Sequence, residues 1–394
     1  MEMLINKNFT KLWFGRLMSN YGDSVVYIVL IWYIMQNTQD MFWVGALNAA
    51  AFAPTMLSFL FGNLIDRHKK GKILVILELG QALGNLMILF AMFCLPIMPL
   101  LLCAIVFFSC MFSMNTYPVQ DAFVPLLVKE EKLEAAQSYM SIGYKIADYL
   151  FNGTIGFVLK MISPIVLLLS SIGSFLLSAT LFQKIDCKEE IKELHHEKSE
   201  SVFEGFKIIF SNPLLRMLTI SSAICNFGFS GFNVYTAQIS KSLNDPTLLG
   251  LISAMLSVGC LFGSTFIVHK VLKGMATYQK MIIGYCFFGF CMAIMSFFVS
   301  GYWTVLAGML VSGFFLGIVQ TVTTPIIQSS IPNEQLGKVF ATQGTISVGI
   351  MPVSSLIWGV LANYISVDIF FVIFGIIYVS CSAIFFYQRN KVVS

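Results

Sequence analysis

The chain has 394 residues, of which 57% are hydrophobic and only 11% are charged, and its mean hydropathy is +0.81. Ordinary soluble domains carry about 25% charged residues, so a soluble core cannot absorb this much apolar surface. The formal net charge of +4 comes from basic residues in short loops, which membrane orientation explains, and we expect no nucleic-acid partner. The composition predicts a protein whose solvent is lipid.

Apolar stretches of about 20 residues recur along the chain, and each is long enough to cross a hydrocarbon core of roughly 30 Å as a helix. Helices are expected because lipid cannot satisfy backbone polar groups, and the alternating pattern of a barrel does not occur. We predict an all-α polytopic membrane protein whose twelve spans lie at 11–35, 42–65, 73–95, 98–122, 137–160, 163–183, 213–239, 247–268, 279–299, 303–327, 339–363 and 366–387.

The basic residues predict the orientation of these spans. Nearly all of them fall in loops on one side, whereas the opposite side keeps only Lys160 and Lys241. By the positive-inside rule both termini are cytoplasmic, which requires an even number of spans. We therefore expect a multi-pass protein of the cell membrane.

The polar segment 184–212 lies at mid-chain and predicts a cytoplasmic linker between a bundle at 1–183 and a bundle at 213–394. The two halves share short patterns: Asn8-Phe-x-x-Leu12 recurs as Asn212-Pro-x-Leu215. Such internal similarity indicates a parallel repeat of six plus six spans. Three small-residue motifs allow close helix approach, which suits bundles that rock on each other; these are Gly80-x-x-x-Gly84, Gly259-x-x-x-Gly263 and Gly313-x-x-x-Gly317.

Between the second and third predicted spans, the chain reads Gly62-Asn-Leu-Ile-Asp66-Arg67-His-Lys-Lys70. This loop resembles the signature loop of the major facilitator superfamily. Further motifs resemble the drug:proton antiporter branch that contains macrolide efflux proteins and the enterobactin exporter; they are Asn8-Phe9-x-x-Leu12-Trp13-x-Gly15, Ser19-x-x-Gly22-Asp23 and Pro118-Val-Gln-Asp-Ala-Phe-Val-Pro125.

The resemblance implies the major facilitator fold, with two six-helix bundles, and a secondary active transporter that acts by alternating access. It implies proton-coupled efflux of small amphipathic compounds such as macrolide-like drugs, with a small-molecule substrate, protons and the lipid bilayer as partners. An enzyme activity and a cofactor are not expected, and we expect a monomer. Two alternatives stay open: export of an endogenous siderophore, peptide or lipid, and a membrane receptor or scaffold without transport.

In the signature loop, a glycine permits close helix contact, and an acid beside basic groups makes a cytoplasmic latch that can break and re-form. The latch residues are Gly62, Asp66, Arg67 and Lys70. The fifth span departs from many drug antiporters, because Phe151-Asn152-Gly153 stands where those proteins carry a Gly-Pro pair.

Charged residues inside the spans are costly and therefore predict function. Asp23 falls near the bilayer centre, where a charged Asp costs about 2.5–3.5 kcal/mol. It is either a carboxyl that gains and loses a proton or pairs with a cationic substrate, or a packing residue held in an interhelical hydrogen bond. Lys145 and Asp148, spaced i, i+3 on the fifth span, form either a structural pair or a coupling element.

Three further charged residues lie toward the cytoplasmic ends of their spans. We predict a structural or gating role for Glu78, and we predict that Arg16 and Asp121 form an ion pair of an inside gate if those ends approach. In the superfamily the first, fourth, seventh and tenth spans line the substrate cavity. The resemblance therefore places the following residues near substrate: Asn115, Tyr117, Asn226, Phe229, Phe232, Asn233, Tyr235, Gln320 and Thr324.

Overall fold

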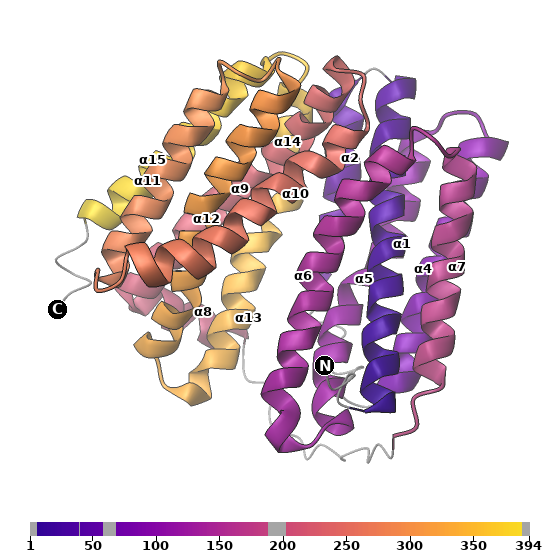
Figure 1. Cartoon of the computed structure of the whole chain (residues 1–394), viewed down its shortest axis with the longest axis horizontal. Helices are drawn as coiled ribbons and strands as arrows, with labels where there is room; N and C mark the ends of the chain where they lie inside the picture. Colours follow the sequence, from indigo (N-terminus) through magenta and orange to yellow (C-terminus); the bar gives the residue numbers. More distant parts are fainter. Residues whose placement is uncertain (1–5, 39, 58–67, 188–201, 388–394) are drawn as a thin grey trace. The chain divides into compact units, whose positions relative to one another are not determined.

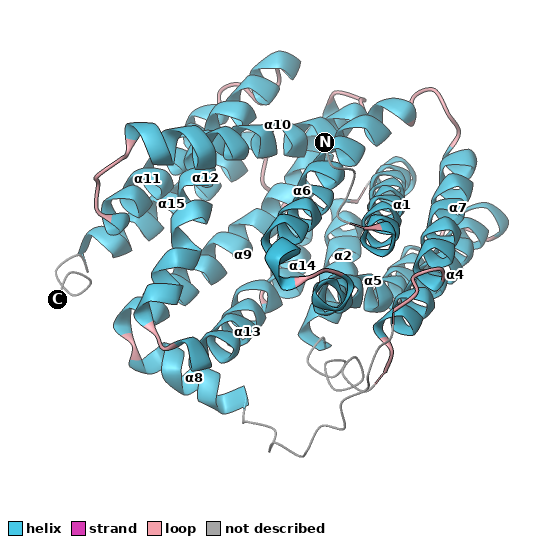
Figure 2. Ribbon diagram, turned by 60° about the horizontal axis from the view of Figure 1, so that its bottom comes forward, coloured by secondary structure: helices cyan, strands magenta, loops and turns pink. Residues whose placement is uncertain are grey.

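The computed structural model describes residues 6–38, 40–57, 68–187 and 202–387. Within these ranges the chain forms helices joined by short loops and contains no strand (Figure 2). The prediction of an all-α protein is therefore confirmed for the part of the chain that is described.

The first half of the chain forms α1 (Lys7–Thr38), α2 (Met41–Phe52), the short 3-10 helix η1 (Ala53–Leu57), α4 (Lys70–Cys94), α5 (Pro99–Leu127), η2 (Glu130–Lys132), α6 (Leu133–Val158) and α7 (Pro164–Gln183) (Figure 1). The second half forms α8 (Val202–Ser211), α9 (Pro213–Ser242), α10 (Thr247–Phe262), the π-helix η3 (Gly263–Val271), α11 (Thr277–Met295), α12 (Tyr302–Ser330), α13 (Asn333–Gly349), α14 (Met351–Leu361) and α15 (Val367–Tyr387).

Asparagine side chains begin the first long helix of each half. Asn6 Oδ1 accepts from the backbone N–H groups of Asn8, at 3.0 Å, and Phe9, at 2.9 Å. Asn212 Oδ1 accepts from Leu214 and Leu215 in the same way, and Pro213 follows it at the first helical position. Both caps satisfy amide groups that a helix N-terminus leaves without partners.

Nine helices among the described residues are long and apolar enough to cross a membrane, or up to ten if α8 and α9, which meet at 105°, form one bent span. The predicted span 42–65 is described only to Leu57. The predicted span 339–363 consists of α13 and α14, which meet at Ile350. Pro352 explains this break, because it has no N–H to donate to the carbonyl of Val348. The count of twelve spans stays a prediction.

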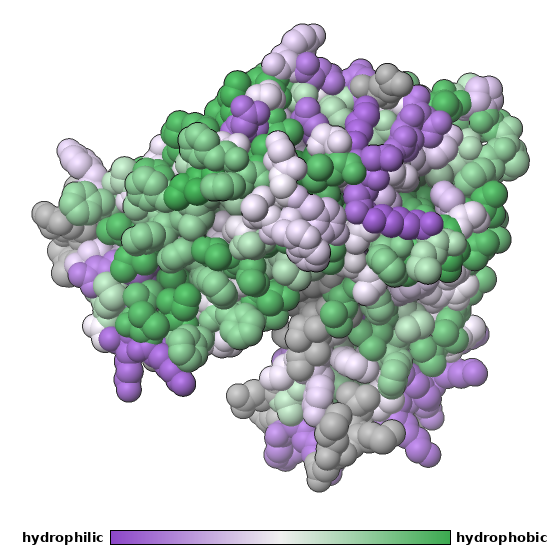
Figure 3. Space-filling view, turned by 45° about the horizontal axis from the view of Figure 1, so that its top comes forward, coloured by the Kyte–Doolittle hydropathy of each residue, from purple (hydrophilic) through white to green (hydrophobic). Residues whose placement is uncertain are grey.

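The helix α4 shows how these helices are adapted to lipid. Its buried face carries polar residues at helical spacing, namely Glu78, Gln81 and Asn85. Its opposite face exposes an apolar stripe of Ile76, Leu79, Leu83, Leu86, Phe90 and Phe93. A soluble protein would not expose so long a stripe. Figure 3 shows that hydrophobic residues spread over most of the visible surface and that hydrophilic residues gather in separate patches.

The chain divides into two compact units. The first consists of Met1–Gln39 and Ala50–His195, and the second consists of Asp40–Ala49 and His196–Ser394. The segment Asp40–Ala49 belongs to the second unit because it packs on α14 and the loop after it. A Cβ on Gly45 would lie 2.3 Å from the carbonyl oxygen of Ser355, and Asn363 Nδ2 donates to Asp40 Oδ1 at 2.6 Å.

Glycines bring α10 and α12 into backbone contact within the second unit. A Cβ on Gly259 would lie 2.0 Å from the carbonyl oxygen of Leu310, and one on Gly313 would lie 2.1 Å from that of Leu256. These glycine motifs therefore allow the close helix approach that the sequence predicted, here between two helices of one unit. Only glycine allows such an approach, since any Cβ would displace the opposing backbone.

Candidate functional site

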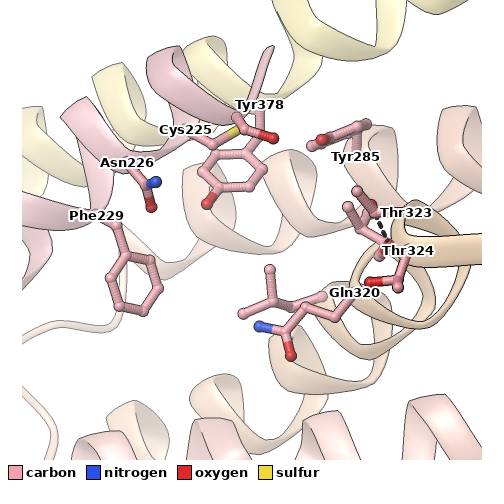
Figure 4. Close-up of a pocket in the computed structure, with 11 residues that line it drawn as sticks. Cys225, Asn226, Phe229, Tyr285, Gln320, Thr323, Thr324 and Tyr378 are labelled. Carbon is pink, nitrogen blue, oxygen red and sulfur yellow. Dashed lines mark hydrogen bonds between the residues drawn. The ribbon is translucent and has the colours of Figure 1, made fainter. Parts of the chain in front are cut away.

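A cavity of about 360 Å³ lies among α9, α11, α12 and α15 of the second unit (Figure 4). Helical spacing explains which residues reach it. On α9 the lining residues are spaced i, i+3, i+4 and i+7, and on α12 the same spacing continues for one more position. The complete lining consists of Ser222, Cys225, Asn226, Phe229, Tyr285, Leu316, Val319, Gln320, Thr323, Thr324 and Tyr378.

The lining of this cavity combines polar and apolar side chains and carries no charged side chain. It combines two amides, several hydroxyls and three aromatic rings, and it includes no Asp, Glu, Lys, Arg or His. The amide of Asn226 is held in place because its Nδ2 donates to the carbonyl oxygen of Ser347 on α13 at 2.9 Å. In Figure 4, Asn226, Phe229 and Gln320 face the same open space. Such a surface can bind a neutral, partly apolar molecule by a few hydrogen bonds and by ring contacts.

Four of the residues that the sequence places near substrate line this cavity: Asn226, Phe229, Gln320 and Thr324. Phe232 and Tyr235 lie elsewhere, in a buried aromatic cluster. Phe232 stacks with Phe374 at 5.9 Å between ring centroids, and Tyr235 stacks on Phe370 at 4.0 Å. Asn233 is half-buried and does not line the cavity.

Sequence reasoning missed several lining residues. Ser222 and Cys225 share the helix face of Asn226, so extending the spacing of α9 toward its N-terminus would have found them. Tyr285 and Tyr378 lie on α11 and α15, which the family resemblance does not assign to the cavity. Nothing in the sequence separates these tyrosines from the other aromatic residues of the same helices.

In the first unit, Arg16 is the centre of a buried polar network. Its side chain is 1% exposed, and its guanidinium carbon lies 3.5 Å from the ring centroid of Tyr117 and 5.4 Å from that of Tyr144. The guanidinium also donates to Asn20 Oδ1, and Asn20 Nδ2 donates to the carbonyl oxygen of Gly143 at 2.7 Å. Arg16 therefore links α1 to α5 and α6 through rings and an amide.

Further polar contacts continue along the interior of the first unit. Asn85 Nδ2 donates to Ser171 Oγ at 3.2 Å, which joins α4 to α7, and Gln81 Nε2 lies 3.4 Å from Thr116 Oγ1 on α5. Tightly buried amides and hydroxyls of this kind replace the hydrogen bonds that lipid cannot offer. A series of polar contacts thus runs through the first unit beside its apolar core.

The predicted gating and coupling carboxylates occupy different places in this unit. Glu78 is 0% exposed. Asp23 is half-buried and accepts from Ser113 Oγ at 3.3 Å. Asp121 is exposed and accepts from Tyr144 Oη at 2.8 Å, so it connects to Arg16 through a tyrosine and not through a direct ion pair. Asn115 Nδ2 donates to the carbonyl oxygen of Met111 on its own helix at 2.7 Å.

The predicted latch and the predicted charged pair of the fifth span are described only in part. Gly62, Asp66 and Arg67 lie outside the described residues, and Lys70 is the first residue of α4. The backbone of Lys145 and Asp148 belongs to α6, but their side chains lie outside what the structure describes.

Known proteins resemble the chain over almost its whole length. Macrolide efflux protein A of Streptococcus pyogenes is 23% identical over 407 residues, which cover 98% of this chain and 96% of that protein. Macrolide efflux protein A of Enterococcus faecalis is 24% identical over 332 residues, which cover 80% of this chain and 97% of that protein.

Solved structures show the same fold at low identity. The nucleoside transporter NupG superposes with a TM-score of 0.71 at 13% identity and covers 97% of this chain and 99% of its own. A bacterial homologue of the iron transporter ferroportin, in an inward-facing state, superposes with a TM-score of 0.73 at 16% identity and covers 96% of this chain and 98% of its own.

The model of the transmembrane secretion effector family, a family of major facilitator proteins, matches residues 2–392. This match spans nearly all of a chain whose helices are membrane-length and whose neighbours in structure are transporters. The chain belongs to the transmembrane secretion effector family of the major facilitator superfamily, and it is a membrane transporter and not an enzyme.

Proposed function

We propose that the chain exports small amphipathic compounds by alternating access and that proton entry drives this export. The cavity of the second unit is the observation that carries the proposal. Its amides and hydroxyls can bind the polar groups of a cargo, and its aromatic rings can bind an apolar surface. The similarity to macrolide efflux proteins over nearly the whole chain supports macrolide-like cargo.

Everted membrane vesicles test transport and coupling together. We expect a radiolabelled macrolide to accumulate inside energised vesicles, and we expect an uncoupler that collapses the proton gradient to abolish this accumulation. Accumulation that persists after the uncoupler contradicts proton coupling. If macrolides do not accumulate, but a strain lacking the protein retains an endogenous metabolite detected by mass spectrometry, the cargo is a siderophore, peptide or lipid.

The role of the cavity is tested with a matched pair of threonines on α12. Thr324 lines the cavity, whereas Thr321 does not, and Thr321 Oγ1 donates to the carbonyl oxygen of Gly317 at 2.7 Å. We expect Thr324→Val to reduce the initial uptake rate about fivefold, because loss of one hydrogen bond to cargo costs roughly 1 kcal/mol. Thr321→Val should transport at the native rate. Equal rates for the two variants would place cargo elsewhere.

A further inference from the structure

Glu78 is the most enclosed carboxyl among the described residues. Its side chain is 0% exposed, and neither carboxyl oxygen has a hydrogen-bond partner. The hydroxyls of Ser19 and Ser178 lie near it, but Ser178 Oγ already donates to the carbonyl oxygen of Gly15 at 2.9 Å. Ser19 is therefore the one neighbouring hydroxyl left to donate. Burying a carboxylate with so few partners costs much more free energy than burying a neutral carboxyl, so the place favours the protonated form.

Arg16 is a buried cation in the same unit, and it has no carboxylate partner among the described residues. Its guanidinium contacts Asn20, Tyr117 and Tyr144, and no carboxylate oxygen among the described residues comes within ion-pair distance of it. Its Nε is also buried without a hydrogen-bond partner. An arginine stays protonated at any physiological pH, so this cation must be stabilised by rings and amides in the present arrangement.

Helix geometry places Arg16 on the face of α1 that lies near Glu78. Arg16, Ser19 and Asp23 are spaced i, i+3 and i+7 on α1 and share a face, and Glu78 of α4 lies near this face. Among the described residues, Arg16 and Asp23 are the charged groups that lie close enough to act on Glu78. The helices α5 and α7, which also pack on α4, bring uncharged residues toward it, and Asp121 on α5 is exposed and bonded to Tyr144.

We propose that Glu78 is the proton-carrying residue of the transport cycle and that Arg16 is the counter-charge that its carboxylate pairs with when the proton leaves. The inference rests on the proton coupling proposed above and moves the proton site from Asp23 to Glu78. The structure has the arrangement of the proton-loaded state, in which a neutral Glu78 lets Arg16 lie on Tyr117 and bind Asn20.

Release of the proton from Glu78 changes the contacts of Arg16 and, through them, the packing of the helices. The new carboxylate attracts Arg16 away from Asn20 and Tyr117, and the buried charge is then paired. Arg16 lies over the ring of Tyr144 on α6 and donates to Asn20, which in turn donates to the carbonyl oxygen of Gly143 on α6, so the departure of Arg16 changes how α1 packs on α6. Proton binding on α4 therefore changes the packing of α1 and α6, which do not carry the proton.

Dicyclohexylcarbodiimide tests this inference without cargo or transport. The reagent is apolar and adds to protonated carboxyls to give a stable N-acylurea. The full-length protein in native membranes is treated from about pH 6 to about pH 9, and mass spectrometry of the digested protein measures the adduct on Glu78, Asp23 and Asp121. We expect the Glu78 adduct to fall about tenfold per pH unit on the alkaline limb, as the protonated fraction does.

Variants at Arg16 test its role as counter-charge. Removing the cation in Arg16→Gln should extend Glu78 labelling to higher pH, whereas Arg16→Lys should keep the native profile. If Arg16→Gln does not fold, the pH profiles of Glu78 labelling in the native protein and in Arg16→Lys still test the inference.

An absent or pH-independent Glu78 adduct overturns the inference, and so does labelling of Asp23 in its place. In transport assays, Glu78→Gln should lose uphill export and keep downhill exchange. Uphill export by Glu78→Gln would overturn the proton site while leaving proton-coupled efflux intact. If the native protein shows no proton-driven uphill export, the proposed function is wrong. The labelling profile still tests whether Glu78 binds and releases a proton.

Discussion

Arg16 and Asp23 lie on the same face of α1, yet their surroundings differ. Arg16 is 1% exposed and enclosed by rings, whereas Asp23 is half-buried and accepts a hydrogen bond from Ser113. A partly accessible carboxylate can attract a cationic group of cargo, and an enclosed cation cannot contact cargo directly. The two charges therefore suit different tasks.

Asp23→Asn tests this assignment at a single residue. The variant keeps an oxygen that can accept from Ser113, so we expect native abundance and thermal stability. Export of a cationic compound should fall about 10- to 150-fold, since one charge-assisted contact contributes roughly 1.5–3 kcal/mol, while export of a neutral analogue of equal size should not change. Equal losses for both compounds would rule out cation recognition, and loss of folded protein would return Asp23 to a packing role.

The sequence identified Arg16, Glu78, Asp121 and Tyr117 as residues of interest but did not place Tyr117 beside Arg16. Charge inside an apolar span marks Arg16, Glu78 and Asp121 as costly, and that signal is visible in the chain alone. The contact between Arg16 and Tyr117 depends on how α1 and α5 are aligned, which no local pattern encodes. Asn20 was missed because a buried asparagine carries no charge to reveal it.

At the scale of helices, glycines bring the backbones of α10 and α12 into direct contact in the second unit. Gly313→Ala adds a Cβ 2.1 Å from the carbonyl oxygen of Leu256, so the backbones must separate. We expect a loss of about 1–3 kcal/mol in the free energy of unfolding, seen as a lower midpoint in thermal unfolding of the purified protein.

Gly173→Ala is the matched control, because a Cβ at this position on α7 meets nothing within 4 Å. Alanine is a better helix former than glycine, so this variant should gain about 0.5–1 kcal/mol. A native or raised midpoint for Gly313→Ala would show that the two backbones can separate without loss.

Hydropathy predicts most helices well because lipid imposes a length on each apolar stretch. The predicted 163–183 and 213–239 correspond closely to α7 and α9. The π-helix η3 was not predicted, since its altered hydrogen-bonding pattern leaves the apolar composition of the predicted 247–268 unchanged. The break between α13 and α14 could have been predicted from Pro352.

At the scale of the whole molecule, the segment Asp40–Ala49 belongs to the second unit although it comes from the first half of the chain. Composition identifies this segment as apolar but not its partner. Its contact with α14 depends on two glycines, Gly45 and Gly359, because a Cβ added to Gly45 would lie 2.7 Å from Gly359 Cα.

Expressing the chain as two fragments tests whether the segment Asp40–Ala49 packs on α14. Fragments 1–195 and 196–394, expressed together with a tag on one of them, should copurify in mild detergent because α2 packs on α14. Gly45→Leu should reduce recovery of the untagged fragment severalfold, since the larger side chain has no space beside Ser355. Gly173→Leu is the control. Fragments that separate completely would show that this contact does not hold the halves together.

The contact between the segment Asp40–Ala49 and α14 also has a consequence for biosynthesis, because its two sides are synthesised at different times. Gly45 is made roughly 300 residues before Gly359, with which it packs. At about 5–20 residues per second, the ribosome needs on the order of 15–60 s to cover that distance. Throughout this interval the glycine face of α2 stays without its final partner in the membrane. Insertion chaperones or neighbouring lipids must cover it, and a pause in translation would prolong this exposure.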